Sequence, residues 1–189
     1  LDAVSLYTAA IDKDPEDIQL FLGRAAAYKY AMDYASARAD YSHVIDFPQE
    51  KLRPYWPNQP KEEYTQLPVA EALWKRGQIY LLENNYTESM NDSNRIIDQI
   101  GDDTDMARLY RSLGYGLRAV VHGSRGHKLR AIRDMQKSQL PGEWDDSESP
   151  FWGFAVLLSF PLLKKVLGPD TADPFDEIID SYKEEARIN

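Results

Sequence analysis

The three histidines are the residues of this chain best suited to general acid–base or metal chemistry. His122 and His127 flank a Gly-Ser-Arg-Gly turn, but no carboxylate lies near them at a spacing that metal-binding motifs use. His43 falls in a predicted helix, where it reads as a packed or surface residue. The Gly-Ser-Arg-Gly turn lacks the Gly-Lys-Ser/Thr ending of a phosphate loop. We therefore predict that the chain is not an enzyme and uses no metal or other cofactor.

Composition restricts the classes of partner. Acidic residues outnumber basic residues by 31 to 22, and the resulting net charge of −9 argues against nucleic-acid binding. The absence of cysteine excludes disulfides, a Cys-ligated zinc site and a thiol nucleophile. No signal peptide is visible, and residue 1 falls inside a predicted helix. We therefore expect the chain to begin inside a longer parent, and we predict a cytoplasmic location.

Amphipathic helices are the elements that would position any binding residues. Apolar residues recur every three or four positions, as Phe21, Ala25 and Tyr28 do, and this spacing indicates helices with one buried face. Asp14-Pro15 closes the first helix and opens the next pair. The helical stretches that we expect cover residues 2–13, 17–31, 34–46, 70–101 and 104–140.

Small and aromatic side chains repeat at matching places in these helices. The matching residues are Ala3, Tyr7, Ala10 and Pro15, then Arg24 to Tyr28 with Tyr34, Ala37 and Tyr41, then Leu73, Gly77 and Tyr80. In this pattern the chain resembles the tetratricopeptide repeat family. The resemblance implies an all-α, right-handed solenoid of helical hairpins with a C-terminal non-repeat helical cap. It also implies an interaction scaffold that binds other proteins, rather than a catalyst.

The repeat pattern divides the chain into units. We expect a third, degenerate unit in which Tyr110, Leu113-Gly114 and Leu117 hold the repeat positions and the turn at residues 122–128 is longer than in the family. The expected units are a half repeat at 1–15, a repeat at 16–49, a Pro-rich insertion at 48–69, a repeat at 70–101, the degenerate repeat at 104–140, and capping helices at 141–189.

The first helices of successive repeats would line the concave face of such a solenoid. The predicted peptide-binding residues there are Lys29, Tyr30, Trp74, Lys75, Gln78, Arg108, Arg111, Tyr115 and Arg118. This set is basic and aromatic within an acidic protein, which suits a partner peptide with acidic character or a free C-terminal carboxylate. The alternative is that these cations are solvated and paired with nearby acids.

A distant similarity to chaperone-adaptor repeats makes a specific version of this prediction. Those repeats bind the C-terminal carboxylate of a chaperone through Lys, Asn and Arg. Here the Asn position is Gly23, the Lys position is Glu71 and the Arg position is Lys75. With only one basic group kept, the co-chaperone function is an alternative and the general peptide scaffold is the main prediction.

Two other segments could dock a partner. Tyr55 and Trp56 lie in the Pro-rich insertion, where they would either cover helix surface or form one wall of a ligand groove. Phe151, Trp152 and Phe154 begin the most apolar stretch, which would either cap the last repeat or dock a partner in a regulatory or assembly domain. That stretch is too short and too broken for a membrane span, and we do not expect contact with a membrane surface.

Overall fold

The computed structural model describes residues 2–54, 58, 61, 65–101 and 104–138, and this part of the chain is helical, with no strand. Tyr55, Trp56, Phe151, Trp152 and Phe154 lie outside the described residues, as does the predicted cap at 141–189. The described elements are α1 (Ala3–Ile11), α2 (Ile18–Tyr30), α3 (Tyr34–Asp46), the 3₁₀ helix η1 (Gln49–Lys51), α5 (Leu67–Leu82), α6 (Tyr86–Gln99), α7 (Asp105–Ser124) and α8 (Lys128–Lys137).

Polar side chains explain where most helices begin. Five helices have a residue before the first turn whose side-chain oxygen accepts a hydrogen bond from a backbone N–H of that turn. The N-cap residues, each with the backbone nitrogen from which it accepts, are Asp2 (Ser5 N), Asp17 (Gln19 N), Asp33 (Ser36 N), Asn85 (Glu88 N) and Thr104 (Ala107 N). Helix α5 lacks such a cap and instead has Pro68 in its first turn, where the missing N–H has no helical partner to lose. It therefore begins three residues before the predicted repeat at 70–101.

Three helical hairpins, α2–α3, α5–α6 and α7–α8, have connections of the same length and conformation. Each connection spans three residues, 31–33, 83–85 and 125–127. The middle residue has a positive φ in each, 59° at Met32, 58° at Asn84 and 76° at Gly126. The expectation of a longer third turn was wrong, because α7 stays helical through Ser124.

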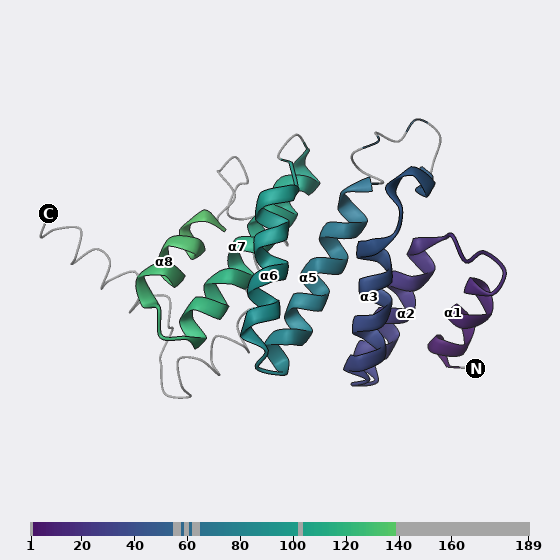
Figure 1. Ribbon diagram of the computed structural model, residues 1–189, viewed down its shortest axis with the longest axis horizontal. Coiled ribbons are helices and arrows are strands. Elements are labelled where there is room, and N and C mark those ends of the chain that lie inside the picture. Colours follow the sequence, from purple (N-terminus) through teal and green to yellow (C-terminus); the bar gives the residue numbers. More distant parts are fainter. Residues whose placement is uncertain (1, 55–57, 59–60, 62–64, 102–103, 139–189) are drawn as a thin grey trace, which may run out of the picture.

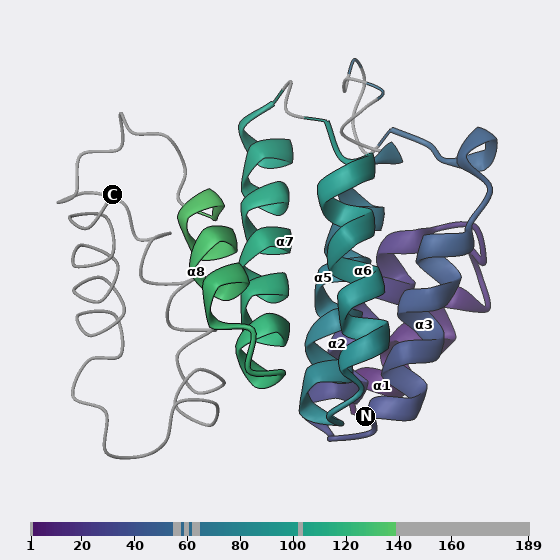
Figure 2. The same cartoon turned by 60° about the vertical axis from the view of Figure 1, so that its left-hand side comes forward.

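The helices stack in one elongated row, with α1 at one end and α8 at the other (Figures 1 and 2). Each helix packs on its neighbour in the sequence, and the first helices of the hairpins also contact one another, α2 with α5 and α5 with α7. We call α2, α5 and α7 the first-helix row. For the described residues the all-α prediction is confirmed, and their helices lie close to the predicted spans.

The core runs between the hairpins, and small residues let the helices approach. Ala25, Ala37 and Tyr41 are fully buried where α2 meets α3. At Gly114 of α7 an added Cβ would lie 2.8 Å from Ile96 Cγ2 of α6, so any side chain larger than hydrogen would collide with the neighbouring hairpin. The close contact thus fixes the position of α7 on α6.

Candidate functional site

A repeated ion pair joins the two helices of each hairpin. In each pair the arginine donates from Nε and Nη2 to the two oxygens of an aspartate sixteen residues later. We call the three pairs the arginine–aspartate ladder: Arg24–Asp40, Arg76–Asp92 and Arg118–Asp134.

The hairpin geometry explains why these residues meet. Arg76 is the seventh residue from the end of α5, and Asp92 is the seventh residue of α6. With a three-residue turn between them, both side chains stand about two helical turns from the connection and face each other. The same positions hold the pairs in the other two hairpins. Equal turn length therefore sets the spacing of sixteen.

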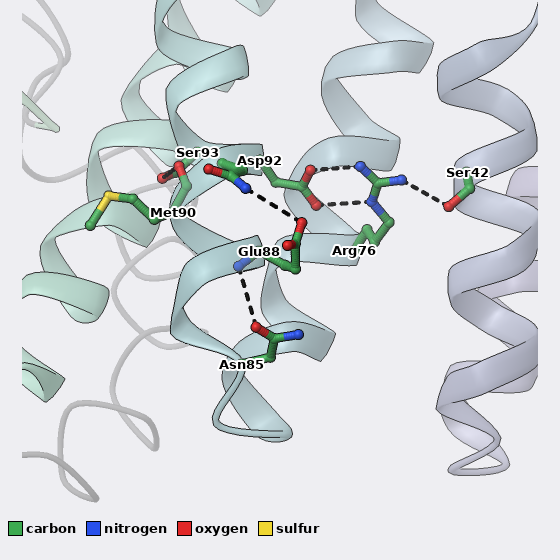
Figure 3. Close-up of polar contacts among 8 residues, drawn as sticks. Ser42, Arg76, Asn85, Glu88, Met90, Asp92 and Ser93 are labelled. Carbon is green, nitrogen blue, oxygen red and sulfur yellow. Dashed lines mark hydrogen bonds and ion pairs between the residues drawn. The ribbon is translucent and has the colours of Figure 1, made fainter.

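The middle pair, drawn in Figure 3, has the least exposed side chains of the three pairs. Arg76 Nε lies 2.9 Å from Asp92 Oδ2, and Arg76 Nη2 lies 2.7 Å from Asp92 Oδ1. The Asp92 side chain is 2% exposed and that of Arg76 is 13% exposed. Burial raises the pKa of Asp92 above its usual value, and the hydrogen bonds and charge of Arg76 oppose that rise. The two side chains are buried and bonded to each other, so this pair is a structural element and not a ligand site.

Each ladder arginine also reaches back to the preceding hairpin or helix. Arg76 Nη1 donates to Ser42 Oγ of α3 at 2.8 Å (Figure 3). Arg24 Nη1 donates to Thr8 of α1 at 3.3 Å, and Arg118 Nη1 donates to Asn94 of α6 at 2.9 Å. Each guanidinium thus bonds to two other helices, its hairpin partner and the helix before the hairpin, and so connects three helices.

A second polar cluster lies on the first-helix row, between α2 and α5. Lys29 Nζ donates to Gln78 Oε1 at 2.8 Å, and both side chains are half-buried. Burial lowers the pKa of Lys29, and the charge of Lys75 lowers it further. We call Lys29, Gln78 and Lys75 the lysine cluster. The sequence analysis selected all three as binding residues, and the structure brings them together from two hairpins.

An acid of the same helix neutralises one of the two lysines. Lys75 Nζ lies 2.7 Å from Glu71 Oε1, one turn earlier on α5. Burial raises the pKa of Tyr110 on α7, and the charge of Glu71 and its hydrogen bond to the phenol raise it further. The polar surface therefore continues from α2 across α5 to α7.

The two predicted aromatic residues nearest this cluster differ in burial. Tyr30 is 90% exposed at the end of α2, where it is available to a partner. Trp74 is half-buried and packs against both hydrophobic clusters of the core. Trp74 therefore supports the fold at this point as well as bordering the lysine cluster.

The predicted residues of α7 lie in several places. Arg108 pairs with Asp105 in the first turn, and Arg111 is half-buried. Tyr115 and Arg118 point toward α8: Arg118 joins the ladder, and Lys137 Nζ lies 5.4 Å from the centre of the Tyr115 ring. The structure does not bring these last two into the lysine cluster.

The histidines form no metal site in the part of the chain that is described. His122 Nε2 lies 3.7 Å from Asp134 and its ring centre lies 5.8 Å from that of His127, while the exposed His43 stacks on the buried Phe21. Among the described residues, no group of three or more His, Cys, Asp or Glu could hold a metal ion. No helix there has the length and apolar character to cross a membrane.

Comparison with protein-family models, with curated proteins and with solved structures finds no match to this chain. The candidate site is therefore defined by its own geometry. The sequence analysis missed the ladder, although a signal was present: an arginine followed sixteen residues later by an aspartate occurs in all three hairpins.

Proposed function

We propose that this protein is a non-catalytic interaction scaffold that holds a peptide segment of a partner protein on the first-helix row. In this proposal the hairpins form a right-handed superhelix similar to tetratricopeptide repeats, with the first helices on its concave side. The predicted acidic character of the partner follows from the exposed and half-buried cations on that side.

The observation that carries the proposal is the lysine cluster. A half-buried ammonium group held between two hairpins has a solvation cost that a structural role alone does not require. The ladder already joins neighbouring hairpins through fully engaged arginines. The cluster is therefore better explained as a recognition surface than as a further structural link.

The chaperone-type carboxylate site receives no support from these contacts. An added Cβ at Gly23 would lie 2.4 Å from the Tyr7 ring, so an asparagine there would require the Tyr7 side chain to move. Lys75 is the one basic residue kept at the three positions of the chaperone-type site, and it is paired with Glu71. A different arrangement on the same row is the better proposal.

A selection from displayed random peptides tests this function. We expect the wild-type protein to enrich acidic sequences, and the Lys29→Glu/Lys75→Glu variant to lose them. The variant Lys13→Glu/Lys128→Glu is the matched control, because it changes the net charge equally at two exposed lysines. Circular dichroism checks that all three proteins are equally helical. Equal enrichment by the wild type and the Lys29→Glu/Lys75→Glu variant would overturn the proposal.

A further inference from the structure

Lys29 is a partly buried cation without an acidic partner in the described part of the chain. Its ammonium group donates to the neutral amide oxygen of Gln78, 2.8 Å from Nζ. The neighbouring Lys75, by contrast, pairs with Glu71. An ammonium group has three N–H donors, so Lys29 can donate further hydrogen bonds to a ligand.

The surroundings of Lys29 disfavour its charge. Burial removes water from the ammonium group, and Lys75 adds a like charge nearby. Lys75 Nζ lies 2.7 Å from Glu71 Oε1, but Lys29 forms no ion pair with any residue that the structure describes. An anion placed against Lys29 would offset both effects.

We propose that Lys29 and Gln78 form a carboxylate-binding subsite, in which Lys29 binds the carboxylate and Gln78 orients the lysine. The inference rests on the proposed function, and it names the chemical group of the partner that this site recognises. Lys29 and Gln78 lie outside the three positions that chaperone-adaptor repeats use, which here are Gly23, Glu71 and Lys75.

Carboxylate specificity follows from the donor set. Lys29 contributes a point charge with rotatable donors, which suits a single carboxylate oxygen. The Gln78 oxygen already accepts from Lys29, so its amide nitrogen remains as a second donor close to the same position. A cation at this place would be repelled by the Lys29 charge, which no acid compensates within the described residues.

NMR titration with two small carboxylates tests the subsite without a known partner. N-acetylglutamate α-amide offers a side-chain carboxylate, and N-acetylleucine offers a terminal carboxylate. We expect at least one of them to give a saturable shift of the Lys29 ε-methylene signals and to raise the pKa of Lys29. Sodium chloride at matched ionic strength is the control, and Lys13 and Lys128 should shift equally in both salts. The compound that saturates the Lys29 response at the lower concentration shows whether the site prefers a side-chain carboxylate or a terminal carboxylate.

Variants separate recognition from structural effects. Gln78→Leu should weaken carboxylate binding about tenfold, because Lys29 loses the acceptor that orients it. Lys29→Met keeps the apolar stem and should abolish the saturable response, while Lys29→Arg should keep most of it; in these two variants the response is followed on the side-chain amide signals of Gln78. Urea unfolding of each variant checks that the fold is retained.

The outcomes distinguish this inference from the proposed function. A Lys29 response to carboxylates that equals its response to chloride would overturn the subsite, whether or not the peptide selection succeeds. Enrichment of peptides that have neither an acidic residue nor a free C-terminus, lost in the Lys29→Glu/Lys75→Glu variant, would likewise overturn the subsite and leave the scaffold function standing. A saturable Lys29 response together with a failed selection would support the subsite and refute the scaffold.

Discussion

Removal of Asp92 should destabilise the protein more than removal of the acid of either other ladder pair. Asp92→Ala leaves the Arg76 guanidinium in a site where it is only 13% exposed, with both of its bonds to the carboxylate lost. Breaking a buried ion pair by removing one partner costs about 3–5 kcal/mol. Since Arg76 keeps its 2.8 Å bond to Ser42, we expect a loss of about 3 kcal/mol.

Urea unfolding followed by far-ultraviolet circular dichroism measures this loss as a change in the free energy of unfolding. The double variant Arg76→Met/Asp92→Leu is the informative control, because replacing both charges with apolar groups is often neutral or stabilising. Glu16→Ala breaks an exposed pair with Arg53 and should leave the midpoint nearly unchanged. If Asp92→Ala unfolds at the same urea concentration as Glu16→Ala, the ladder is not a structural element and our reasoning is refuted.

Three further predictions test the packing and electrostatics of the hairpins. Burial holds the pKa of His122 below its ordinary value of 6.5, so the folded state binds fewer protons than the unfolded state. The free energy of unfolding should therefore fall as the pH drops below about 6.5. Urea midpoints measured across this pH range should lose that dependence in His122→Tyr. Gly114→Ala should cost about 1–3 kcal/mol of unfolding free energy, because its Cβ would meet the stiff Ile96 side chain. Gly116→Ala is the control: its added Cβ would have its nearest contact 4.0 Å away, so this change should be neutral or slightly stabilising. The opposite order of the two variants in thermal unfolding would contradict the packing. Thr104→Ala should cost about 1 kcal/mol through loss of the N-cap of α7, and Thr104→Ser should restore most of it in the same assay.

The helices could be predicted from the sequence because local signals agree with the fold. Apolar spacing and the Asp14-Pro15 turn mark the ends of α1, α2 and α3 to within about one or two residues. The third hairpin was harder, because Gly123 suggested a turn where the packed helix α7 continues to Ser124. Tertiary packing there outweighs the local preference of glycine.

Side-chain directions were predicted less well than helices. Lys29, Lys75 and Gln78 meet as expected, because two well-matched repeats fix their relative positions. In the third unit the repeat was aligned on Leu113, but Arg118 occupies the place of the ladder arginines in the other two hairpins. The repeat position on α7 is therefore five residues later than expected, and Arg118 faces α8. The position of the turn between α7 and α8 is needed to detect this difference.

The ladder depends on the tertiary structure in the same way. A spacing of sixteen brings two side chains together only when a connection of the right length folds the second helix back onto the first. The sequence shows the spacing, but the three-residue turns that make it meaningful appear only in the structure. This is why the arginine–aspartate pairs were not selected in advance.

NMR mapping of an enriched acidic peptide tests the central claim most directly. The account predicts that backbone amide shifts on binding concentrate on α2 and α5 around Lys29 and Gln78, with smaller changes on α7 near Tyr110. Shifts concentrated on α3, α6 and α8, with α2 and α5 unchanged, would show that the partner binds the opposite side of the row and would contradict the account.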